Sequence, residues 1–153
     1  MKIKYFLLVT FVLIVLFIWG NSLLPPEVSG QISGTVKDFL TLVLGDAGGS
    51  ENDVELHFWV RKLAHFFEFF ALGTVGALLL RFYSRDLAQR WCYIAIIGLF
   101  FALTDETLQL FSARGSSVRD VWIDLCGYLA GCFFAELLII FRKKLISGRK
   151  KQT

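Results

Sequence analysis

Four long runs of apolar residues divide the chain, and polar or charged stretches separate them. The runs cover residues 5–24, 59–80, 91–111 and 121–141. About 20 consecutive apolar residues are enough for an α-helix to cross the hydrocarbon core of a bilayer. The pattern therefore predicts an all-α fold, an integral membrane bundle of four transmembrane helices.

The first apolar run has an alternative interpretation as a signal peptide, because Lys2 and Lys4 precede it. However, the run is longer than the apolar part of a typical signal peptide, and no small-residue cleavage site follows it. Pro25 and Pro26 instead end the segment sharply. We therefore expect a first transmembrane helix rather than a cleaved signal.

The segment Glu27–His57 is more polar than the rest of the chain. Apolar residues recur there at helical spacing between Val28 and Leu44, a pattern typical of an amphipathic helix that lies in the membrane interface. The glycine-rich stretch 45–50 is typical of a loop. We therefore expect an interfacial helix after the first transmembrane helix.

Composition agrees with a membrane protein, since 56% of the residues are hydrophobic and only 19% are charged. Both values depart from those of an ordinary soluble domain. The three cysteines, Cys92, Cys126 and Cys132, have neither the number nor the spacing of a disulfide framework or a metal motif. We interpret them as small packing residues.

Basic residues are distributed unevenly, although the net charge is only +3. With four membrane crossings, eleven of the 16 Lys and Arg residues fall on the side of the N-terminus and five on the other side. Because basic residues favour the cytoplasmic side, we expect a multi-pass protein of the cell membrane with both termini in the cytoplasm. Residues 1–141 then form a single membrane domain and 142–153 a basic cytoplasmic tail. We expect no nucleic-acid partner.

Three of the apolar runs contain ionisable residues near one end. Such residues are costly inside a membrane and usually face the protein interior or a water-filled pocket. At 1.5 Å per residue they lie about 6 to 14 Å from the helix ends on the same side, which we expect to be extracytoplasmic. The predicted polar site consists of Lys62, His65, Glu68, Asp105, Glu106, Gln109, Arg114, Asp120 and Asp124.

One face of the fourth predicted helix carries both acids and glycines. Asp120, Asp124, Gly127 and Gly131 follow one another at i, i+4, i+7 and i+11. Glycines on such a stripe let a neighbouring helix approach closely. We therefore expect the acidic face of this helix to be packed against protein rather than lipid.

The end of the third helix offers a choice between two adjacent acids. Glu106 and Gln109 are three residues apart and share a face, whereas Asp105 points elsewhere. We therefore expect Glu106 to belong with Gln109. If the role of these two residues is only structural, they would hydrogen-bond Arg114 or Arg119.

Residues 114–117 connect the third and fourth helices. Ser117, with Asp120 three residues later, fits a capping-box variant, so we interpret Ser117 as a helix cap and not as a nucleophile. Arg114 and the following amides also form a weak phosphate-binding pattern.

The polar residues leave three roles open. His65, Glu68 and Glu106 are candidates for acid–base catalysis, because groups held partly out of water can exchange protons with a substrate. The same residues can instead form a balanced network of ion pairs that only holds the helices together. Their types would also suit a divalent metal, but we predict no metal and no other cofactor.

Two stretches of the sequence resemble the signatures of VanZ-like membrane proteins, and the resemblance extends to about Gly131. The first is RKLAHFFEF at 61–69 with Leu72-Gly73, and the second is DETLQ at 105–109 with Arg114, Asp120, DLCG at 124–127 and Gly131. Ser22, Pro25 and Ser33 resemble the N-terminal pattern of that family. The chain departs from many relatives in having Ser112-Ala113-Arg114 where they have Pro-Gly-Arg.

The resemblance implies a small multi-pass membrane protein. Our own functional prediction is that it acts at the outer surface on a membrane lipid or amphiphilic ligand. The namesake of the family is associated with resistance to teicoplanin, so protection against glycopeptides or other amphiphilic antimicrobials is implied by resemblance alone. No established catalytic activity is implied. The alternative is a membrane enzyme that uses acid–base or metal chemistry on a lipid-linked substrate.

Overall fold

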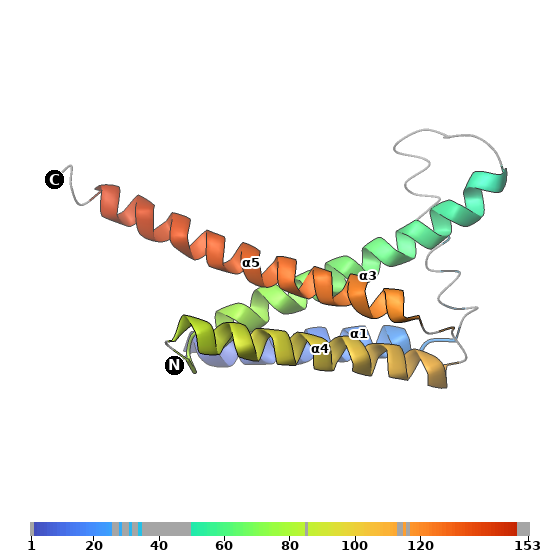
Figure 1. Ribbon diagram of the computed structural model, residues 1–153, viewed down its shortest axis with the longest axis horizontal. Coiled ribbons are helices and arrows are strands. Elements are labelled where there is room, and N and C mark those ends of the chain that lie inside the picture. Colours follow the sequence, from blue (N-terminus) through green and yellow to red (C-terminus); the bar gives the residue numbers. More distant parts are fainter. Residues whose placement is uncertain are drawn as a thin grey trace.

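The computed structural model describes residues 2–25, 28, 31, 34, 50–84, 86–112, 115 and 117–149. It contains α1 (Lys2–Ser22), α3 (Ser50–Leu80), α4 (Leu87–Phe111) and α5 (Val118–Arg149), labelled as in Figure 1. The described residues contain no strand. The predicted all-α fold is therefore confirmed.

Each of the four helices holds a segment that is long and apolar enough to cross a membrane. These segments are Lys2–Ser22, Phe58–Leu80, Leu87–Phe111 and Val118–Lys144. Many of their large apolar side chains point outward, with Phe67 61% exposed and Ile96 67% exposed. Such exposure is unfavourable in water and favourable among lipid tails. The chain is therefore a multi-pass membrane protein.

Several helices extend beyond the predicted bounds, most of all α3, which begins at Ser50 rather than 59, and α5, which ends at Arg149 rather than 141. The helix α4 begins at Leu87 because Asp86 caps it, with 2.7 Å between the Gln89 backbone nitrogen and Asp86 Oδ2. The helix α5 continues to Arg149, so most of the predicted basic tail prolongs this helix. The predicted interfacial helix between Val28 and Leu44 lies largely outside the described residues. Residues 50–57, at the end of the polar segment that contains it, belong to α3.

The helices α3 and α5 cross in close contact, as Figure 1 shows. A Cβ atom added to Gly127 would collide with the backbone oxygen of Phe66, and one added to Gly131 would collide with that of Phe70. Gly73 meets the backbone of Tyr128 in the same way from the other helix. The predicted glycine stripe therefore faces α3 and sets the distance between the two helices.

The core lies around this crossing. Phe69 and Leu72 of α3 and Tyr128 of α5 are fully buried, and Ile18 of α1 and Ile94 of α4 are 1% exposed. All four helices thus contribute to one core. The packing fixes their relative positions and therefore the positions of the polar residues at their ends.

The start of α1 and the end of α5 lie at the same end of the bundle (Figure 1). Close to that end, Glu136 lies 3.4 Å from Arg81 Nη1 and 3.6 Å from Arg90 Nη2. Two arginines lie close to one glutamate there, so this cluster carries a net positive charge. The cytoplasmic location of this end stays a prediction.

Candidate functional site

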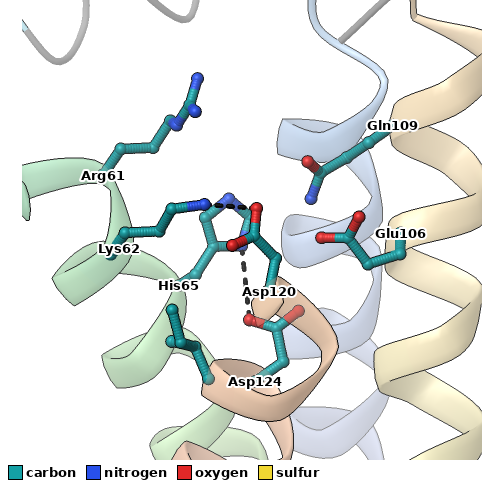
Figure 2. A pocket seen from close by; sticks show the side chains of 8 residues that line it. Arg61, Lys62, His65, Glu106, Gln109, Asp120 and Asp124 are labelled. Carbon is teal, nitrogen blue, oxygen red and sulfur yellow. Dashed lines mark ion pairs between the residues drawn. The ribbon is translucent and has the colours of Figure 1, made fainter. Parts of the chain in front are cut away.

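The opposite end of the bundle holds a polar pocket, where α4 ends, α5 begins and the first half of the α3 span passes. Figure 2 shows the side chains that converge on it. The pocket measures about 230 Å³ when the part open to the exterior is included. Its walls are formed by Arg61, Lys62, His65, Glu106, Gln109, Asp120, Ile123 and Asp124.

The last turn of α1 forms hydrogen bonds to acids of the site on α3 and α4. Ser22 donates a hydrogen bond from Oγ to Asp105 Oδ1 on α4 at 2.5 Å, and Asn21 donates from Nδ2 to Glu68 Oε1 on α3 at 2.8 Å. Ser112, just after α4, donates a hydrogen bond from Oγ to the backbone oxygen of Ser22 at 2.9 Å. The end of α1 therefore orients acids on two other helices.

Glu106 and Gln109 both line the pocket, which agrees with their predicted common face. The expectation that Asp105 points elsewhere was wrong, because Gln109 donates a hydrogen bond from Nε2 to Asp105 Oδ2 at 2.8 Å. Residues four apart lie on the same side of a helix as well as residues three apart. Asp105 is fully buried and Glu106 is 6% exposed, so both adjacent acids belong to the site.

Glu106 instead holds the start of α5. Its Oε2 accepts a hydrogen bond from the Ser117 backbone N–H at 2.9 Å, while Ser117 Oγ accepts one from the Arg119 N–H at 3.2 Å. Ser117 is thus a helix cap, as predicted. In the usual capping box, the side chain three residues after the cap, here Asp120, would accept the hydrogen bond from the Ser117 N–H. In this protein Glu106 accepts that hydrogen bond instead.

Asp120 forms an ion pair with Lys62 of α3, drawn as a dashed line in Figure 2. Both side chains are largely buried, with 9% and 14% of their area exposed. Arg61, the neighbour of Lys62, forms no ion pair with any residue that the structure describes. In Figure 2 its guanidinium extends away from the carboxylates. Among the described residues, the pocket therefore has one cation that is paired with an acid, Lys62, and one that is not, Arg61.

His65 lies between two acids from different helices. Its Nδ1 is 3.7 Å from Asp105 Oδ2 on α4 and 3.9 Å from Asp124 Oδ1 on α5. Asp105 is fully buried and Asp124 is 1% exposed. One donor atom from each of the three side chains lies within 4.8 Å of the other two. Three helices thus place a histidine and two carboxylates at one point.

Two buried carboxylate oxygens of the site accept no hydrogen bond from the described residues. They are Glu106 Oε1 and Asp124 Oδ2. A buried polar atom without a partner is costly, and a buried charge more so. Among the described residues the site is also rich in acid, with five carboxylates and three basic side chains: Glu68, Asp105, Glu106, Asp120 and Asp124 against Arg61, Lys62 and His65. A cation at these carboxylates would be stabilised, whereas Arg61, whose guanidinium extends away from them, is suited to an anion.

Comparison with protein families gives a match. The model of the VanZ/LLP1 family matches residues 6–141, which include every residue of the site and nearly all of the four apolar runs. The chain belongs to the VanZ/LLP1 family. Comparison with curated proteins gives no match, and comparison with solved structures gives none.

In this VanZ/LLP1-family chain, the structure brings together most of the predicted site. Glu68 lies behind the pocket, held by Asn21, and Arg119 is exposed. Arg114 lies outside the described residues. The residues of the prediction that line the pocket are Lys62, His65, Glu106, Gln109, Asp120 and Asp124, with Asp105 beside them.

Sequence reasoning missed three contributors to the site. Arg61 lines the pocket, whereas Asn21 and Ser22 bind its acids from behind. A signal for the last two is visible in the sequence, since they are adjacent hydrogen-bonding residues near the end of an otherwise apolar run. Polar groups at such positions need partners inside a membrane protein.

Proposed function

We propose that this chain binds the phosphate-bearing head group of a membrane amphiphile in the polar pocket, on the extracytoplasmic side of the membrane. The observation that carries the proposal is the position of Arg61. It lines the pocket without an ion-pair partner among the described residues, next to a lysine whose charge is already balanced. A guanidinium can bind a phosphate through two parallel hydrogen bonds.

Exposed aromatic side chains at the same end support a position near lipid head groups. Phe58 is 48% exposed, Trp59 is 54% exposed and Trp122 is 61% exposed. Tryptophan is enriched at the boundary between the hydrocarbon core and water, where its ring contacts both. A pocket at this level would meet a head group while the acyl chains stay in the bilayer.

Membership of the family suggests one further class of amphiphilic ligand, the lipid-bearing glycopeptide antibiotics. VanZ-like proteins are associated with resistance to teicoplanin, and we propose by resemblance that this chain protects against lipid-bearing glycopeptides. Deleting the gene should then increase sensitivity to such antibiotics. Unchanged sensitivity to glycopeptides and to membrane stress would remove this role and leave head-group binding to be tested separately.

The binding proposal is tested by calorimetric titration of the purified chain, in nonionic detergent, with dihexanoyl-phosphatidylglycerol. We expect Arg61→Gln to weaken binding roughly 10- to 100-fold, the equivalent of one charged hydrogen bond. Arg119→Gln is the matched control, because Arg119 is exposed near the same end but does not line the pocket. Equal binding by wild type and Arg61→Gln would contradict the proposal.

A second candidate function is a membrane enzyme that transforms a lipid-linked substrate. It is favoured by the position of His65 between Asp105 and Asp124, since carboxylates can orient an imidazole that accepts a proton. The variants His65→Gln and Glu106→Gln separate the two functions. If the variants still bind the ligand but no longer turn over lipid-extract substrates, the protein is an enzyme. If the wild type turns over no such substrate, with or without divalent metal, the enzyme hypothesis is wrong.

A further inference from the structure

We propose that His65, Asp105 and Asp124 bind a divalent transition-metal ion at the base of the polar pocket. The inference goes beyond head-group binding, because an ion can occupy these residues whether or not an amphiphile is present. It begins with the convergence of one imidazole and two carboxylates from three different helices.

The distances suit a single ion. Bonds of about 2.0–2.2 Å to nitrogen and oxygen place the ligand atoms of one ion about 3 to 4.4 Å apart. His65 Nδ1 lies 3.7 Å from Asp105 Oδ2 and 3.9 Å from Asp124 Oδ1. No pair among the three donor atoms is more than 4.8 Å apart. A small side-chain rotation therefore completes the geometry.

An independent observation is the free oxygen of Asp124. Asp124 is 1% exposed and lines the pocket, yet its Oδ2 has no hydrogen-bond partner among the described residues. The same holds for Oε1 of Glu106, which is 6% exposed and lines the same pocket. Since buried carboxylate oxygens are normally satisfied, these two atoms are available to bind a cation.

The surroundings of Asp105 resemble those of a metal ligand. Its Oδ1 accepts a hydrogen bond from Ser22 and its Oδ2 accepts one from Gln109, so the carboxylate is fixed from two sides. Outer-shell hydrogen bonds of this kind orient ligands and raise metal affinity. His65 and Asp124 line the open pocket and so provide a path for an ion to enter.

The mixture of ligands limits the kind of ion. Imidazole suits Zn²⁺, Fe²⁺ and related ions, whereas Mg²⁺ and Ca²⁺ prefer sites made only of oxygen. We therefore expect Zn²⁺ to bind more tightly than Mg²⁺. A bound ion would also add positive charge beneath Arg61 and favour a phosphate, a consequence that rests on the proposed function.

The test measures binding of Zn²⁺ and Mg²⁺ to the full chain in nonionic detergent after removal of bound metal with EDTA. We expect one Zn²⁺ ion per chain and weaker binding of Mg²⁺. His65→Gln and Asp124→Asn should weaken binding by more than the roughly 10- to 100-fold that loss of an outer-shell partner costs. Asp86→Asn, the same exchange at the exposed cap of α4, should bind like the wild type.

If the variants fail to fold, Co²⁺ binding to the wild type still tests whether the metal site exists. One equivalent of Co²⁺, displaced by Zn²⁺ and visible by the absorption of a nitrogen- and oxygen-bound ion, supports the inference. No bound ion in the wild type, equal binding by wild type, His65→Gln and Asp124→Asn, or preference for Mg²⁺ overturns it. Arg61→Gln separates the two proposals, because it should lose the phosphate head group and keep Zn²⁺.

Discussion

Glu106 on α4 accepts a hydrogen bond from the backbone N–H of Ser117, with 2.9 Å between Oε2 and the nitrogen. The first N–H groups of a helix have no partner within that helix. Here the partner comes from the preceding helix, so one bond both caps the start of α5 and joins it to α4. Asp120, which would otherwise serve the cap, is left to pair with Lys62 on α3.

Glu106→Ala should therefore lower the free energy of unfolding by about 1–3 kcal/mol, the cost of leaving a partly buried donor unsatisfied. Glu106→Gln keeps an acceptor oxygen and should lose less. Thermal unfolding of the purified chain in detergent measures both variants. Wild-type stability of Glu106→Ala would show that the bond to Ser117 does not hold α5.

The contact between α3 and α5 gives a second prediction. Gly131→Ala forces a Cβ into the Phe70 backbone and should cost about 1–3 kcal/mol or more, as overpacking does. Gly20→Ala is the matched control, because nothing lies within 4 Å of its added Cβ and alanine is favoured in a helix. Equal unfolding temperatures for the two variants would contradict the packing.

The sequence predicted the four helices because apolar length is a strong signal in a membrane protein. The glycine stripe of α5 was also readable, since the face shared by Asp124, Gly127 and Gly131 follows from helical geometry alone. In the structure this face lies against α3. Regular spacing within one helix thus predicted which side of α5 is packed.

The partners across helices could not be predicted in the same way. Asp105 and Glu106 are adjacent and point in different directions, which suggested that only Glu106 would lie with Gln109. In the structure α1 supplies Ser22 to the first and the start of α5 supplies Ser117 to the second. Which helix lies on each side of α4 depends on the packing of the whole bundle. The spacing of residues within α4 does not predict these neighbours.

The topology gives a third prediction. After Cys92, Cys126 and Cys132 are replaced by alanine, single cysteines at Gly115 and Ser147, both exposed, should lie on opposite sides of the membrane. We expect a membrane-impermeant maleimide to label position 115 in intact cells and position 147 only after permeabilisation. Labelling of both positions in intact cells, or the reverse pattern, would contradict the proposed orientation.

The most direct test of head-group binding is photocrosslinking from the pocket wall. A photoreactive residue at Ile123, which lines the pocket, should crosslink to phosphatidylglycerol in nanodiscs. The same residue at the adjacent Trp122, which is 61% exposed, reports ordinary lipid contact. Excess glycerol phosphate and Arg61→Gln should each reduce the adduct at 123 and leave that at 122 unchanged. An adduct at 123 that neither treatment reduces, or no adduct there, would contradict a head-group site.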